Sequence, residues 1–120
     1  GWQNCLFSGC TILALPSFRD RIPVIVDEVT TLTGPGELVD VVVTERGLAV
    51  NPRRQDLLAA LEGSDLPIRP IEEIKTEVER LVGGAPTRPS LGDEAVAVIK
   101  WVDGTVIDTV WRVPETSESA

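Results

Sequence analysis

The stretch LVDVVVTERGLAVNPRR, residues 38–54, decides the fold class of this chain. Residues 38–44 are rich in valine and apolar almost without interruption, which predicts a strand that is covered on both faces. A polar turn, Glu45-Arg46-Gly47, follows, and Leu48-Ala49-Val50 forms a second short apolar run. Glu45 is therefore predicted at the carboxyl end of a buried strand, where open α/β sheets place their ligands.

Two interpretations of Glu45 follow from this pattern. A polar turn between two buried segments is the simpler one, and the pattern alone favours it. A carboxylate held at a strand end for function is the alternative. Gly47 suits both, because glycine permits a backbone turn that other residues resist.

Two amphipathic helices are predicted after this stretch. Asn51 is a favoured N-cap and Pro52 fits the first helical position, so the first helix should begin there and end near Gly63. The second should follow Pro70, where apolar residues recur at helical spacing, and end at Gly83-Gly84.

Further strands are predicted on both sides of the helices. Residues 11–15 form a short apolar run, and residues 22–26 form another in which Pro23 requires a strand start or edge. Asp103-Gly104 lies between two β-rich runs and predicts a hairpin in which both turn residues can accept positive φ. The order indicates an α/β domain over residues 1–113, followed by a flexible acidic tail over residues 114–120.

Composition excludes several classes of protein. The chain has 120 residues and a net charge of −8, which argues against a nucleic-acid partner. No apolar run reaches about 18 residues and no signal peptide is visible, so we expect no membrane span and a cytoplasmic location. The sequence has no methionine and begins abruptly, and we expect it to be a piece of a longer protein.

The side chains available for chemistry are few. Cys5 and Cys10 are the only cysteines and histidine is absent, too few ligands for a Cys/His metal site. We expect two buried free thiols, with a disulfide or a reactive thiol as alternatives. No dinucleotide, Walker A or nucleophile-elbow motif is present.

The arginines of the first half are the candidate anion ligands. Arg53 and Arg54 fall in the first turn of the predicted helix, an unfavourable place for a cation unless an anion binds there. Arg19 and Arg21 flank Asp20 in a predicted loop and could join them. A solvated surface is the simpler interpretation of all four.

Three segments carry a resemblance to a known family: SFRDRIP at residues 17–23, VDVVVTERGLAVNP at residues 39–52 and DGTVID at residues 103–108. They resemble the C-terminal end of the citrate lyase α subunit family, the citrate CoA-transferase component of that lyase. VTERGLA matches the V-T-E-x-G-(I/L)-A motif of the wider CoA-transferase group throughout. The resemblance implies an α/β fold of the CoA-transferase type, with flanking helices, a C-terminal β-hairpin and a truncated N-terminus.

The resemblance also implies a reaction. The intact subunit would exchange acetyl for citryl on the acyl carrier's thioester, using citrate and releasing acetate. The thioester is borne by a phosphoribosyl-dephospho-CoA arm on the carrier, and no cofactor would be bound to this chain. The implied partners are the carrier (γ) and lyase (β) subunits, with a homo-oligomer as a further possibility, and the fragment alone should be inactive.

Site residues follow from the same resemblance. Gly1 matches the second glycine of a Gly-Gly loop, and the Gly1 and Trp2 amides would hold an oxyanion. Gly1 and Glu45 are the catalytic candidates, and Glu45 would line the acyl pocket. The candidate substrate-binding residues are Trp2, Gln3, Asn4, Arg19, Arg21, Gly47, Arg53 and Arg54, although Asn4 stands where many relatives carry aspartate.

Two other functions remain open at this point. One is a CoA-transferase or acyl-CoA hydrolase that uses free CoA. The other is a non-catalytic module in which the hairpin and its tryptophans, Trp101 and Trp111, bind a partner subunit.

Overall fold

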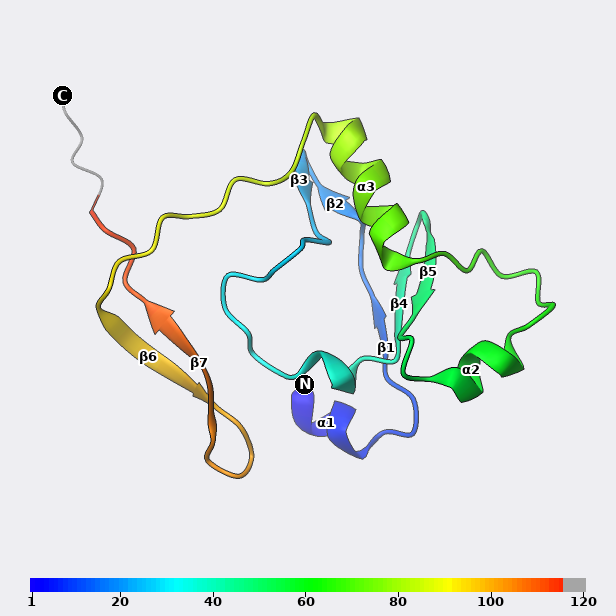
Figure 1. The fold of residues 1–120 in the computed structure, drawn as a ribbon, viewed down its shortest axis with the longest axis horizontal. Helices are drawn as coiled ribbons and strands as arrows, with labels where there is room; N and C mark the ends of the chain where they lie inside the picture. Colours follow the sequence, from blue (N-terminus) through cyan, green and yellow to red (C-terminus); the bar gives the residue numbers. More distant parts are fainter. Residues whose placement is uncertain (116–120) are drawn as a thin grey trace. The chain divides into compact units, whose positions relative to one another are not determined.

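The computed structural model describes residues 1–115, which divide into two compact units (Figure 1). Unit 1 comprises Gly1–Asp27 and Gly36–Pro86, and unit 2 comprises Glu28–Pro35 and the described residues from Thr87 onward. The predicted domain over residues 1–113 therefore contains two units. Residues 116–120 of the predicted tail lie outside the described residues.

A three-stranded sheet forms the centre of unit 1, with β4 (Val41–Thr44) between β1 (Ile12–Ala14) and β5 (Gly47–Val50). β1 and β4 are parallel, with Ile12 opposite Val41, and β4 and β5 are antiparallel. Val41 and Thr44 are buried, and the two valines between them are partly buried. The predicted strand over residues 38–44 is confirmed in its last four residues, because η1 (Gly36–Leu38) is a 3₁₀ turn.

The helix α3 (Ile71–Val82) supplies the best-buried side chains of unit 1. Ile74 and Val78 are 0% and 1% exposed, and α3 contacts β3 and β5. Burying two such side chains stabilises the unit by about 1.5–3 kcal/mol each. Gly83 ends the helix, as predicted, and adopts the left-handed conformation with φ of 97°.

The helix α2 (Gln55–Ala60) begins later than predicted. The Asn51 amide donates to the Asp40 carbonyl at 2.7 Å, and the Asn51 carboxamide donates to the Val39 carbonyl at 3.0 Å. Asn51 is thereby tied to the strand region, and the Arg54 amide donates to its carbonyl in a turn. The prediction of a helix start at Asn51-Pro52 is wrong for this reason, and α2 ends at Ala60, with Leu61 as its C-cap, before Gly63.

Two short elements complete unit 1. A two-stranded ribbon joins β2 (Phe18–Arg19) to β3 (Ile22–Pro23), so Pro23 lies in an edge strand, as predicted. The six-residue helix α1 (Trp2–Phe7) buries no residue. Cys5 is half-buried and Cys10 is exposed, and both are free. The predicted free state is confirmed and the predicted burial is wrong, because Cys5 lies in a short helix that buries no residue and Cys10 lies in the exposed loop after it.

Unit 2 contains the predicted hairpin, formed by β6 (Ala95–Lys100) and β7 (Val106–Trp111). Its turn differs from the prediction. The Gly104 amide donates to the Trp101 carbonyl at 2.9 Å, and Gly104 has φ of 88° while Asp103 has no positive φ. A longer turn with one left-handed glycine therefore replaces the two-residue turn. None of the helices over residues 1–115 is long and apolar enough to cross a membrane.

Candidate functional site

The strand-end site, defined here as Ser17, Glu45 and Arg46, lies at the carboxyl ends of β1 and β4. The Leu15 amide donates to the Val43 carbonyl at 3.0 Å and extends the parallel pairing toward Ser17. Ser17 is fully buried, and its amide donates to Glu45 Oε2 at 3.0 Å and to Oε1 at 3.3 Å. The Ser17 hydroxyl also donates to Glu45 Oε1. The Glu45 carboxylate therefore joins the carboxyl ends of the two parallel strands through hydrogen bonds to Ser17.

The surroundings of Glu45 favour its ionised form. The Ser17 hydroxyl lowers the pKa of Glu45, the Ser17 amide and Arg46 act in the same direction, and desolvation opposes them. The side chain remains 50% exposed. Glu45 is thus an ionised hydrogen-bond acceptor that solvent or a ligand can reach.

Arg46 links the strand end to α3. Its Nε lies 3.8 Å from Glu45 Oε1, its Nη1 lies 3.3 Å from Glu77 Oε1, and its guanidinium lies 5.8 Å from the centre of the Phe18 ring. A guanidinium held by two carboxylates and an aromatic face has little freedom to move. Arg46 therefore contributes to the support of the turn that carries Glu45.

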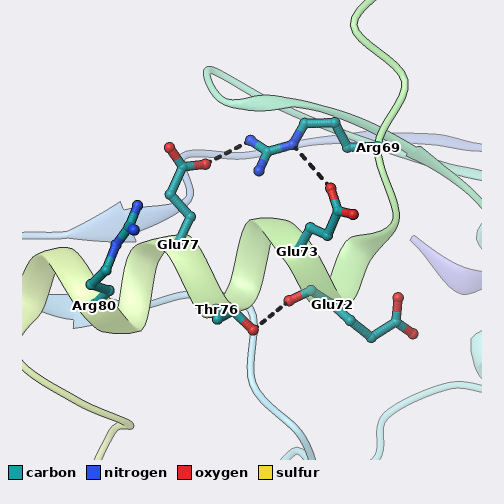
Figure 2. A pocket seen from close by; sticks show the side chains of 6 residues that line it. All are labelled: Arg69, Glu72, Glu73, Thr76, Glu77 and Arg80. Carbon is teal, nitrogen blue, oxygen red and sulfur yellow. Dashed lines mark hydrogen bonds and ion pairs between the residues drawn. The ribbon is translucent and has the colours of Figure 1, made fainter.

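Glu77 is shared by two arginines. Arg69 Nη1 lies 2.6 Å from Glu77 Oε2 and 3.0 Å from the Arg46 carbonyl. Arg69 Nε also lies 3.8 Å from Glu73, and Figure 2 shows Arg69 between Glu73 and Glu77 above α3. We call Arg46, Arg69, Glu73 and Glu77 the Glu77 cluster. It borders an open hollow of about 460 Å³ on the α3 surface, to which Glu72, Thr76 and Arg80 also contribute.

Gly47 permits a close approach between two segments. Its φ is 137°, and a Cβ there would lie 2.9 Å from the Pro67 carbonyl oxygen and 3.0 Å from Arg69 Cδ. The adjoining Leu48 amide donates to that carbonyl at 3.0 Å. The Thr44 hydroxyl donates to the Gly47 carbonyl and accepts from the Arg46 amide, which holds the turn. Gly47 has a clear structural role, and its contact with substrate stays a prediction.

Arg53 and Arg54 lie at the opposite end of the sheet and precede α2. The prediction that they occupy its first helical turn is wrong, because the helix begins at Gln55. Arg54 Nη1 lies 3.0 Å from Asp40 and donates to the Gly9 carbonyl, and Arg54 Nη2 lies 2.8 Å from Asp56. Asp56 and then Asp40 raise the pKa of Arg54, and Arg54 lowers the pKa of Asp56 to about 2. Arg53 pairs with Glu37 at 3.2 Å, and both are largely exposed.

The remaining candidates also divide between the two ends. Trp2, Gln3 and Asn4 lie in α1, which contacts η1 beside the amino ends of β1 and β4 (Figure 1). At roughly 3.3 Å per residue, the four residues of β4 separate that end from Glu45 by about 13 Å. Gly1 precedes α1 and lies at the same end. Arg19 and Arg21 belong to the β2–β3 ribbon that follows Ser17, and both are exposed.

The structure therefore brings Glu45 together with Ser17, and links it through Arg46 to Glu77. The sequence did not single out Ser17 or Glu77 as functional. The position of Ser17 after the parallel strand next to Glu45 was a usable signal, because carboxyl ends of parallel strands share one edge. Glu77 carried no such signal within the polar face of a helix. Over residues 1–115, no group of three or more Cys, Asp or Glu side chains could hold a metal ion.

The fold and the strand-end site together define an α/β protein with an ionised carboxylate at the carboxyl ends of two parallel strands. The family model for the citrate lyase alpha subunit matches residues 2–113. The chain belongs to the citrate lyase α subunit family.

Individual relatives agree with this assignment. The citrate lyase alpha chain from Haemophilus influenzae is 42% identical over 87% of this chain, a match that covers 21% of the relative. The alpha chain from Klebsiella pneumoniae is 44% identical over 86% of this chain, a match that covers 20% of the relative. The alpha chain from Escherichia coli is 41% identical over 94% of this chain and 22% of the relative. The chain thus spans about a fifth of the length of these relatives.

A solved structure gives the same result. The putative alpha subunit of citrate lyase from Streptococcus mutans, in complex with citrate, is 42% identical. It superposes with a TM-score of 0.83 over 88% of this chain and 21% of that one.

Proposed function

We propose that this chain forms part of an α subunit that exchanges acetyl for citryl on the thioester of an acyl carrier. A citrate carboxylate oxygen attacks the acetyl thioester carbonyl, expels the carrier thiolate and forms a mixed anhydride. The thiolate then attacks the citryl carbonyl and expels acetate. The observation that carries the proposal is the ionised, half-exposed Glu45 of the VTERGLA motif, held by Ser17 at the carboxyl ends of two parallel strands.

In this reaction Glu45 lines the acyl pocket and positions groups. It does not need to form a covalent bond, because citrate and the carrier supply both nucleophiles. The Gly1 and Trp2 amides, which we propose hold the oxyanion, lie at the amino ends of β1 and β4. They therefore belong to a different surface of the unit from the one that carries Glu45.

The carrier's phosphoribosyl-dephospho-CoA arm would supply the reactive thiol. Among the predicted cations, Arg19 and Arg21 suit its phosphates or the citrate carboxylates, because both are exposed on the ribbon that follows Ser17. Arg54 does not suit them, because its guanidinium already contacts Asp40, Asp56 and Gly9.

The proposal extends to the assembly. The carrier (γ) and lyase (β) subunits are the partners, with a second copy of the α subunit as a further one, in the cytoplasm. The 120-residue chain alone is expected to be inactive, because it spans about a fifth of the relatives' length.

The test uses a subunit of the relatives' full length that contains this sequence, assembled with its carrier and lyase subunits. Citrate is mixed with the acetylated carrier, and mass spectrometry of the carrier thioester measures exchange. Glu45→Ala should lower kcat/KM by about 10²-fold, as expected for loss of a group that positions a substrate. The control Glu62→Ala removes an exposed carboxylate elsewhere in unit 1 and should change little.

The outcomes separate the alternatives. Unchanged exchange in Glu45→Ala would contradict the role of Glu45. Exchange with free acetyl-CoA in preference to the carrier would identify a CoA-transferase or hydrolase that uses free CoA. No exchange by the parent assembly would indicate a non-catalytic interaction module.

A further inference from the structure

Ser17 and Glu45 differ in how much each depends on the hydrogen bonds between them. Ser17 is fully buried, so its hydroxyl and amide require partners inside the protein. The Glu45 side chain is 50% exposed, so water could satisfy it. Ser17 therefore determines which way the carboxylate faces, and Glu45 gains orientation more than solvation.

The two carboxylate oxygens are not equivalent. Oε1 accepts from the Ser17 hydroxyl, lies 3.3 Å from the Ser17 amide and faces Arg46 Nε at 3.8 Å. Oε2 accepts from the Ser17 amide at 3.0 Å. A carboxylate has about four lone-pair sites. Most of the remaining acceptor capacity therefore lies on Oε2.

We propose that Ser17 is a positioning residue that holds Glu45 as an ionised acceptor with Oε2 presented to the substrate. The group that meets Glu45 is then a hydrogen-bond donor, such as a hydroxyl or an amide N–H. A carboxylate or phosphate is excluded from that position, because like charges repel in a partly desolvated site. This inference rests on the proposed function and specifies what Glu45 recognises.

The variant Glu45→Gln tests the polarity of that position. The Ser17 amide can only donate, whereas the Ser17 hydroxyl can donate or accept, so the glutamine presents to the substrate either its NH₂ group or a neutral carbonyl oxygen. In either orientation the charged acceptor is lost without a change in size. We expect kcat/KM in the assembled full-length enzyme to fall about 10- to 100-fold, the range for loss of a hydrogen bond to a charged group.

Two substrates identify the source of the donor. Citrate has a hydroxyl group, and propane-1,2,3-tricarboxylate lacks it. A fall in kcat/KM for citrate alone would assign the donor to the hydroxyl of the acid. An equal fall for both acids would assign it to an amide of the carrier arm. Wild-type kcat/KM in Glu45→Gln for both acids would overturn the proposal.

The role of Ser17 is tested without activity. We would measure the pKa of Glu45 by carboxyl-carbon NMR in the 120-residue chain and in Ser17→Ala, Ser17→Thr and Val78→Ala. The pKa should be below the ordinary value in the parent chain, rise in Ser17→Ala and return in Ser17→Thr, which restores a hydroxyl. Val78→Ala is the control for lost core packing, because it removes buried methyl groups without touching Glu45.

The two proposals fail in different ways. A parent pKa of Glu45 at the ordinary value, or no rise in Ser17→Ala, would overturn the role of Ser17, whatever the enzyme does. No acyl exchange by the parent assembly would overturn the proposed function and leave the measured pKa values intact. In active enzyme, the acidic limb of the kcat/KM profile should move to higher pH in Ser17→Ala, because Glu45 is then protonated more easily.

Discussion

The Arg54 guanidinium lies 3.0 Å from the Asp40 carboxylate and donates to the Gly9 carbonyl from the same nitrogen. Asp40 in turn accepts the Thr11 amide at 2.7 Å. Arg54 thereby joins the loop before β1, the start of β4 and the start of α2. The guanidinium of its neighbour Arg53 pairs with the exposed Glu37. Two adjacent arginines therefore differ in how much of unit 1 depends on them.

Arg54→Ala should destabilise unit 1 clearly more than Arg53→Ala. The first variant leaves Asp40, which is 9% exposed, without its cation. The second removes an exposed pair, and its effect should stay within about 0.5 kcal/mol. Urea unfolding followed by far-UV circular dichroism would measure both. Equal unfolding midpoints would contradict a structural role for Arg54.

The ion pairs of Arg54 also predict how the stability of the folded state depends on pH. Arg54 holds the pKa of Asp56 at about 2, and the Thr11 amide, followed by Arg54, lowers the pKa of Asp40 from its ordinary 3.8. The folded state therefore binds fewer protons than the unfolded state at acid pH. The resulting stability is present above pH 3.8 and is lost as the pH falls towards about 2.

Urea midpoints should accordingly be level near neutral pH and should fall between about pH 4 and 2. In Arg54→Ala this acid dependence should be smaller, because both carboxyls then titrate nearer their ordinary values. Arg53→Ala should retain the parent's acid dependence. An unchanged acid dependence in Arg54→Ala would show that other carboxyls cause the loss of stability.

The elements that could be predicted from the sequence depend on local patterns. The run of valines in residues 41–43 produced β4, the helical spacing of Ile74 and Val78 produced α3, and Asp103-Gly104 marked the hairpin. The place of Glu45 at a strand end followed from the same pattern. Each of these signals lies within a few residues of the element it predicts.

The features that were missed depend on partners far along the chain. Ser17 and Glu45 are 28 residues apart, and only the parallel pairing of β1 with β4 brings them together. The start of α2 was misplaced because the Asn51 amide is bound by Asp40. Arg54 was predicted as an anion ligand because the sequence does not reveal that its guanidinium contacts Gly9, which lies 45 residues away. Parallel pairing and long-range ion pairs leave no periodic trace in a sequence.

The shared Glu77 supports a third prediction. Glu77→Gln removes the charge that separates Arg46 from Arg69, so two guanidiniums would face each other with less compensation. The urea midpoint should fall, and added salt should reduce the loss by screening the repulsion. The matched control Glu72→Gln changes an exposed carboxylate on the same helix and should have little effect. A loss that salt does not alter would point to hydrogen bonding in place of charge.

Gly47→Ala should be among the most damaging single-methyl substitutions in unit 1. The added Cβ would lie 2.9 Å from the Pro67 carbonyl oxygen, a backbone atom, at a φ of 137° that alanine rarely adopts. Strain of this kind costs about 1–3 kcal/mol. Gly36→Ala is the control, because its Cβ would meet nothing within 4 Å and its φ is not positive.

The same substitution should also disturb the strand-end site. Gly47 follows Arg46 directly, so a shift that relieves the contact with Pro67 moves the turn that carries Glu45. In the 120-residue chain, the carboxyl-carbon signal of Glu45 should therefore change in Gly47→Ala and remain in place in Gly36→Ala. A destabilised Gly47→Ala chain with an unchanged Glu45 signal would show that Ser17 alone fixes the carboxylate, independently of the turn.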